Sequence, residues 1–158
     1  MKNMVPSRTH GSKPYFEGWY LKQQSPRGQT LALIPAFHTG GGGRRTASLQ
    51  IIANDKSWWL EYPEEQMRVA RQPFQMQIGP SAFGFQGIRL QIQQEDLSLH
   101  GVLRYGPLTA LRSDIMGPFR FFAGMQCVHG VISMGHSLSG TVELNGEPLD
   151  FSGGIGYM

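Results

Sequence analysis

The segment that decides the fold is residues 73–106, PFQMQIGPSAFGFQGIRLQIQQEDLSLHGVLRYG. In residues 74–78 and again in residues 88–93, apolar side chains alternate with glutamine or arginine. Successive side chains of a β-strand point to opposite faces of its sheet, so this period of two predicts strands with one buried and one solvent-facing side. A further strand, with Leu97 and Leu99 on its buried side, is predicted after the acidic turn that follows.

Strand signals continue toward the N-terminus. Residues 13–23 carry four aromatic side chains, and residues 30–38 and 46–53 form short, largely apolar runs. A Ser-Pro-Arg-Gly turn at residues 25–28 separates the first two runs, and the glycine-rich loop 39–45 separates the last two. These signals predict three strands, the last two joined as a hairpin.

Strand signals also continue toward the C-terminus. Residues 126–137 and 138–144 are predicted to form a pair of strands. The dipeptide Asn145-Gly146 then predicts a tight hairpin turn into residues 148–151, because both central residues of such a turn need a positive φ.

Turn residues are abundant and helical patterning is almost absent. The chain contains 21 glycines and 10 prolines, and the only helix-like stretch, residues 64–71, is short. About nine or ten short strands with turns between them predict an all-β protein, either an antiparallel sandwich or a barrel. A barrel is the preferred prediction because closure removes exposed sheet edges. A barrel of this size can enclose one small apolar ligand.

Composition and charge exclude several other classes of protein. The chain has 158 residues, 40% hydrophobic and 16% charged, so it is neither disordered nor a coiled coil. Its net charge is +3 and its arginines are scattered, so no nucleic-acid partner is expected. No apolar run is long enough to span a membrane. Residues 1–13 lack the apolar core of a secretory signal, which predicts a cytoplasmic location.

Familiar chemical sites are also disfavoured. The glycine run 40–43 lacks the lysine and the following helix of a phosphate-binding loop, so it is predicted to be a hairpin loop. Cys127 is the single cysteine, and with His129 it supplies only two local ligands, so no metal is predicted. His136 is predicted to be a hydrogen-bonded interior histidine. No Gly-x-Ser-x-Gly elbow supports a hydrolase triad.

Glu17 is the strongest candidate for chemistry. If it points inward, it shares a face with Tyr15 and Trp19, while Phe16 and Tyr20 take the opposite face. A carboxylate on an apolar wall must be paired, or it keeps a proton and can act as a general acid. Pairing with an arginine for purely structural reasons is the alternative.

Three ordered blocks of the sequence resemble the tocopherol cyclase family. Residues 14–22, PYFEGWYLK, resemble the family's opening Phe-Glu-Gly-Trp-Tyr-Phe-Lys motif. Residues 125–136, MQCVHGVISMGH, are similar to its Met-Glu-Cys-x-His-Gly-Val-Val-Ser-Met-Asp-His block. Residues 138–157, LSGTVELNGEPLDFSGGIGY, resemble the family's glycine-rich segment. Together these blocks span nearly the whole chain.

The resemblance implies a fold and a reaction. Family members contain two lipocalin-like antiparallel β-barrels and are related to carotenoid 1,2-hydratase, and a full member is about twice as long as this chain. Residues 1–158 would then be the N-terminal barrel of a bacterial relative, with the second barrel absent. The implied reaction is acid-catalysed cyclisation of a prenylated or isoprenoid lipid through alkene protonation, without a cofactor. Glu17 and His129 would be catalytic; the substrate-binding residues would be Tyr15, Trp19, Tyr20, Cys127 and His136.

Two departures from the family motif keep other functions open. Gln126 stands where the family has a glutamate and Gly135 where it has an aspartate, so two titratable groups are missing. Whether the chain is an enzyme is therefore open. The alternatives are a non-catalytic barrel that binds a lipid or another small apolar ligand, or a structural half-domain that forms a homodimer or pairs with the missing second barrel.

Overall fold

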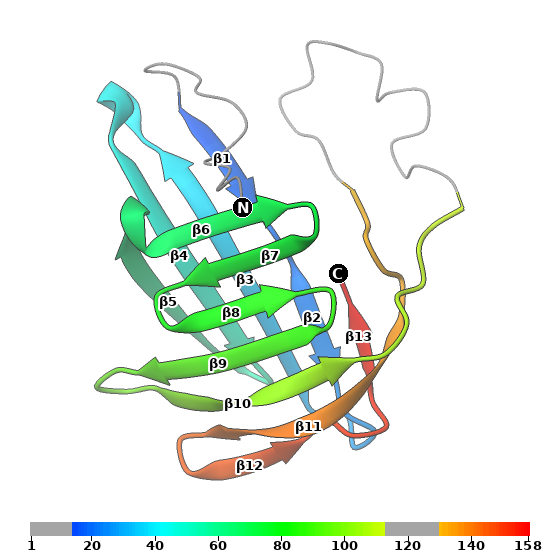
Figure 1. The fold of residues 1–158 in the computed structure, drawn as a ribbon. Helices are drawn as coiled ribbons and strands as arrows, with labels where there is room; N and C mark the ends of the chain where they lie inside the picture. Colours follow the sequence, from blue (N-terminus) through cyan, green and yellow to red (C-terminus); the bar gives the residue numbers. More distant parts are fainter. Residues whose placement is uncertain (1–13, 113–129) are drawn as a thin grey trace.

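The computed structural model describes residues 14–112 and 130–158 of the chain (Figure 1). Within these residues the regular structure is β-strand, apart from two short 3-10 turns, η1 (Gly41–Gly43) and η2 (Glu64–Gln66). Thirteen strands belong to one sheet. They are β1 (Tyr15–Gly18), β2 (Leu21–Gln24), β3 (Thr30–Thr39), β4 (Arg45–Ala53), β5 (Lys56–Pro63), β6 (Met67–Arg71), β7 (Phe74–Ile78), β8 (Ser81–Gly84), β9 (Gly87–Gln93), β10 (Ser98–Tyr105), β11 (His136–Leu144), β12 (Glu147–Asp150) and β13 (Ile155–Tyr157).

The sheet consists of two antiparallel meanders joined by the last strand. Strands β2 to β5 are consecutive neighbours, with β1 beside β3, and strands β6 to β11 are consecutive neighbours, with β12 beside β11. Strand β13 pairs with β2 on one side and with β11 on the other. In Figure 1, β2–β5 lie behind β6–β10, because the sheet curls back on itself and brings its end strands, β5 and β6, toward closure. The prediction of an all-β, lipocalin-like antiparallel barrel is confirmed.

The core lies between the two meanders and is built from alternate residues. Strand β7 alternates strictly between buried and exposed positions, and β9 continues this alternation. Burying one large aliphatic or aromatic side chain contributes about 1.5–3 kcal/mol relative to leaving it exposed. The buried side chains of this core include Leu31, Leu33, Leu49, Ile51, Phe74, Met76, Ile78, Ile88, Leu90 and Ile92.

Two glycines allow a close approach between β10 and β11. Gly101 and Gly140 have φ values of 147° and 122°, which side-chain-bearing residues rarely adopt. A Cβ on Gly101 would collide with the backbone of Val142, and a Cβ on Gly140 would collide with that of Val102. Glycines inside strands are typical of such close approaches and of sharp bends at barrel corners.

Several local predictions are confirmed. The Gly28 N–H donates to the Ser25 carbonyl at 3.0 Å, which closes the predicted turn at residues 25–28. The glycine loop joins β3 to β4 as a hairpin. Asn145 and Gly146 both have positive φ values, 50° and 86°, and connect β11 to β12.

Two other local predictions need correction, and one strand has no counterpart in the prediction. The helix-like stretch 64–71 is wrong beyond its first turn: residues 67–71 form β6, because Met67 and Val69 alternate into the core. Strand β5 was not predicted. The expected strand pair over residues 126–144 is replaced, within the described part, by the single strand β11.

The physical reason for the last correction lies in residues 130–135. The N–H groups of Ile132 and Ser133 both donate to the Met158 carbonyl at 2.8 Å, and the Met134 N–H donates to the Thr109 carbonyl at 2.8 Å. These backbone groups are therefore satisfied by irregular contacts instead of a strand ladder. Residues 126–129 lie outside the described part of the chain.

Candidate functional site

The aromatic segment at the start of the described chain alternates as expected. Glu17 is half-buried and lies opposite Phe37 of β3, whose side chain belongs to the core. Phe16 is 61% exposed on the opposite face. The Phe16 ring folds back over Gly18, where a Cβ would come within 2.7 Å of it. Glu17 therefore points inward, which is the condition under which the sequence puts it on one face with Tyr15 and Trp19.

Glu17 and Trp19 lie on an aromatic stretch of the inner wall. The Tyr15 hydroxyl donates to Glu17 Oε2 at 3.2 Å. The Trp19 indole packs against the core, with ring centroids 6.5 Å from Phe37 and 6.4 Å from Phe74. The carboxylate and the indole therefore share this stretch, with a phenol bonded to the carboxylate.

Tyr20 lies on the outer face. It is 44% exposed, and its ring centroid is 6.1 Å from that of Tyr157. The other predicted site residues of the second motif, Cys127 and His129, lie outside the described residues.

His136 is an interior histidine, as predicted. It begins β11 and is only 4% exposed. Its Nδ1 lies 3.0 Å from Ser133 Oγ, which already accepts a hydrogen bond from the Thr109 N–H at 3.1 Å. The serine hydroxyl proton is then best placed toward Nδ1, which leaves the proton of a neutral imidazole on Nε2.

Three residues that the sequence did not reveal, Gln23, Tyr105 and Ser133, complete this site. Gln23 is fully buried, and its Nε2 donates to the hydroxyl of Tyr105 at 2.7 Å. The Tyr105 and His136 rings lie 4.3 Å apart, centroid to centroid. We call Gln23, Tyr105, Ser133 and His136 the polar cluster. Glutamine at position 23, on the same face as the buried Leu21, is a signal that could have revealed it, because a polar side chain there interrupts an apolar face.

The register of three strands explains how the polar cluster forms. Gly156 of β13 lies opposite His136 of β11 on one side and opposite Gln23 of β2 on the other. Directly opposed residues place their side chains on the same face of a sheet. Because Gly156 has no side chain, the imidazole can lean over it toward Gln23.

Two polar atoms of the cluster have no hydrogen-bond partner among the described residues: Gln23 Oε1 and His136 Nε2. If the Gln23 amide is turned over, its nitrogen is left without a partner instead, so one amide atom stays unsatisfied either way. A buried unsatisfied polar group costs about 1–3 kcal/mol, and native proteins contain few of them. The cluster therefore has unused hydrogen-bonding capacity in the interior.

Burial keeps both titratable groups of the cluster neutral. It raises the pKa of the Tyr105 phenol well above its ordinary value of 10.0, and the hydrogen bond from Gln23 offsets this only in part. It lowers the pKa of His136 below 6.5. A neutral imidazole N–H, a neutral phenol and an amide oxygen suit the recognition of an uncharged hydroxyl or carbonyl group.

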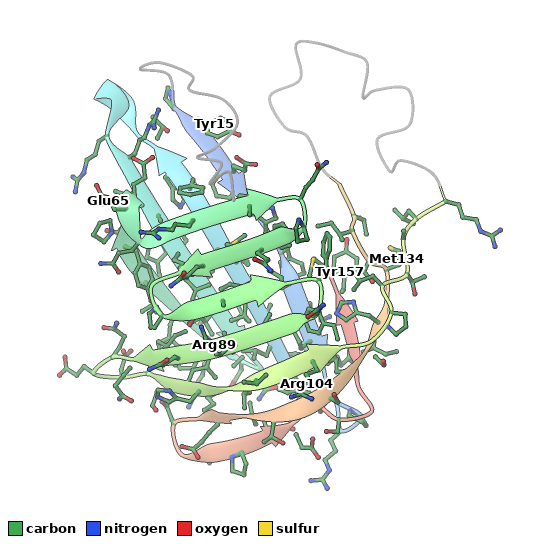
Figure 2. All side chains as sticks on the ribbon, in the orientation of Figure 1. Tyr15, Glu65, Arg89, Arg104, Met134 and Tyr157 are labelled. Carbon is green, nitrogen blue, oxygen red and sulfur yellow. The ribbon has the colours of Figure 1, made fainter. Side chains whose placement is uncertain are left out.

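The structure does not bring all the predicted site residues together. Glu17 lies beside Phe37 of β3 and Gln23 lies beside Leu31 of the same strand. Six residues of a strand span about 20 Å, so Glu17 and the polar cluster are two separate places on the inner wall. In Figure 2, Tyr15 near Glu17 and Tyr157 beside Gly156 are correspondingly well separated.

Comparisons with known proteins give no identification. No model of a known protein family, no curated protein and no solved structure matches the chain. Within the described residues, no group of three or more histidine, cysteine and acidic side chains is placed to hold a metal ion. Among the same residues, no helix has the length and apolarity needed to cross a membrane.

Proposed function

We propose that this barrel binds a small, largely apolar molecule that carries one hydroxyl or carbonyl group. The observation behind the proposal is the pair of unsatisfied buried atoms, Gln23 Oε1 and His136 Nε2, on either side of Gly156. One hydroxyl group of a ligand can donate to the amide oxygen and accept from the imidazole N–H. The apolar part of the ligand would contact the aliphatic and aromatic side chains of the inner wall.

Native mass spectrometry of the full chain purified from cells tests this proposal. The expected result is a bound small molecule, whose mass is lost in a Gln23→Leu, His136→Phe double variant. Gln91→Leu is the matched control, because Gln91 is exposed on β9 and its replacement should leave the adduct unchanged. An empty protein would contradict the proposal, as would a crystal structure in which ordered water satisfies both atoms.

Acid-catalysed cyclisation of a prenylated or isoprenoid lipid is the second candidate, and we propose it together with a relationship to the tocopherol cyclase family. Its support is the inward position of Glu17 beside the Trp19 indole, in the motif PYFEGWYLK. In this reaction the carboxylic acid protonates an alkene carbon and leaves a tertiary cation. A phenol oxygen of the same substrate bonds to the cation and returns its proton to the carboxylate, so the substrate is isomerised and the acid regenerated. The indole face stabilises the cation.

Incubation of the full chain with a prenylated hydroquinone, followed by mass spectrometry and chromatography, tests the second candidate. The expected product is the isomeric chromanol, formed by wild type and lost in Glu17→Gln. Glu61→Gln, an exposed position on β5, is the control and should retain activity. Absence of chromanol would overturn the reaction, whereas unchanged activity of Glu17→Gln would overturn only the role of Glu17.

A further inference from the structure

A groove of about 720 Å³ lies over strands β6–β10. Every described residue that lines it belongs to these strands or to the turns between them, and none comes from β2–β5 across the core. The groove therefore lies on the outer face of the barrel and is separate from the polar cluster. Its volume is within the usual range of ligand-binding clefts.

The groove is hollow because its floor has little side-chain volume. Gly84 and Gly87 lie directly opposite each other on β8 and β9. In the neighbouring row, Ala82 lies opposite Arg89. These three small residues leave a depression in the middle of the sheet face, with longer side chains around it.

Three arginines carry the charge of the groove. Arg68, Arg89 and Arg104 are exposed and line it, and no aspartate or glutamate is among its described lining residues. Figure 2 shows Arg89 and Arg104 on the front strands. None of the three guanidiniums forms an ion pair within the part of the chain that the structure describes, where Arg45 pairs with Glu64 instead. The positive charge is thus left uncompensated by this sheet face.

The spacing of the arginines matches an extended chain. Arg68, Gln77, Ala82 and Arg89 follow one another across β6–β9 in a single row. Three strand spacings separate the two arginines of this row by about 14 Å, which is close to the length of four residues of an extended peptide. Arg104 lies on the next strand, β10.

We propose that this groove, which we call the arginine groove, binds an extended acidic segment of another polypeptide. Guanidinium groups bind carboxylates in a bidentate manner, and the amide of Gln75 beside them can bond to a peptide backbone. Phe85 is the one exposed aromatic side chain in its lining, whereas single-stranded nucleic acids are bound on several stacking aromatics. A hollow also accommodates an extended chain better than a flat lipid surface.

Fluorescence anisotropy with the full chain tests this proposal. The probe is a fluorescein-labelled peptide of alternating glutamate and threonine, and the comparison peptide has glutamine in place of glutamate. The expected result is saturable binding of the acidic peptide alone, weakened by added salt. The triple variant Arg68→Gln, Arg89→Gln, Arg104→Gln should lower affinity at least about tenfold, since each lost guanidinium removes a charge-assisted bond. Arg44→Gln, on the exposed loop after η1, should leave affinity unchanged.

Other binding partners supply the contrary outcomes. Oligothymidylate and vesicles of equimolar phosphatidylcholine and phosphatidylglycerol should bind more weakly than the acidic peptide. The proposal is overturned if either binds more tightly, or if the peptide does not bind. It is also overturned if the triple variant keeps its affinity while circular dichroism shows the native fold. The double variant Arg89→Lys, Arg104→Lys keeps the positive charge but loses the guanidinium groups. A lower affinity of this variant for the acidic peptide supports bidentate recognition, and an unchanged affinity argues against bidentate recognition.

Discussion

The imidazole of His136 lies so close to Gly156 that its Nε2 occupies the space a Cβ of residue 156 would need. The contact is possible because the two residues are directly opposed on β11 and β13. A glycine on the shortest strand of the sheet therefore sets the position of the most buried histidine among the described residues.

Replacing this glycine should be costly. In Gly156→Ala the new methyl group must displace the His136 ring, and such overpacking typically costs about 1–3 kcal/mol. Urea denaturation followed by circular dichroism measures the change in the free energy of unfolding. Gly41→Ala is the control, because a Cβ there meets no atom within 4 Å, and it should be nearly neutral. Equal stabilities of the two variants would contradict the packing described.

Stability should decrease in mild acid because of His136. Burial holds its pKa in the native state below the ordinary value of 6.5. Between these two values the unfolded chain binds more protons than the native chain, so the free energy of unfolding falls as the pH drops through 6.5 toward the native pKa.

Urea titrations from about pH 7.5 down to about pH 5.5 measure this effect against a variant without the titrating group. As the pH falls, the free energy of unfolding of wild type should decrease relative to that of His136→Phe. Gln91→Leu, at an exposed position of β9 that does not titrate, is the control and should run parallel to wild type. A pH-independent difference for His136→Phe would show that this imidazole is not held neutral by burial.

The bond between Gln23 and Tyr105 should be detectable by a double-mutant cycle. Tyr105→Phe removes the acceptor of the Gln23 amide and leaves a buried N–H unpaired, which should cost about 1–3 kcal/mol. Adding Gln23→Leu removes that unpaired group, so part of the loss should be regained. Chemical denaturation of the four proteins gives the coupling free energy. Strictly additive effects would mean that the two side chains do not interact.

Two substitutions at Asn145 separate its two contributions to the hairpin. Asn145 has a φ of 50°, and its Oδ1 accepts a hydrogen bond from the Ser98 N–H at 2.7 Å. Asn145→Gly loses the hydrogen bond but tolerates the positive φ, whereas Asn145→Ala loses both. We expect alanine to cost about 1–2 kcal/mol more than glycine, measured by urea denaturation. Equal costs would show that the backbone conformation contributes nothing.

The parts of the fold that could be predicted are those determined locally. Strands β7 and β9 bury one face completely and expose the other, so their period of two is plain in the sequence. Strand β5 is an edge strand whose inward side chains are only half-buried, and the apolar Trp59 faces out. The difference in hydrophobicity between the two faces of β5 is therefore small, and the sequence does not reveal this strand.

The sequence predicts only those parts of the candidate site whose residues lie on a single strand. The inward face of Glu17 and Trp19 follows from alternation within a single segment. The partnership of Gln23 with Tyr105, 82 positions away, depends on β13 lying between β2 and β11. No local pattern specifies that pairing, because it arises when the sheet closes.

Strand β13 has three residues, yet it is the strand that joins the two meanders. Most strands of each meander pair with the next strand in the chain, so these contacts of short sequence separation can form early in folding. The exceptions are β1, which pairs with β3, and the β10–β11 pair, whose strands are joined by residues 106–135. Pairing β13 with β2 connects opposite ends of the described chain, and its loop-closure entropy is offset only once both meanders exist. We therefore expect the pairing of β13 with β2 to be the last step of folding, so that weakening it accelerates unfolding and leaves the folding rate almost unchanged.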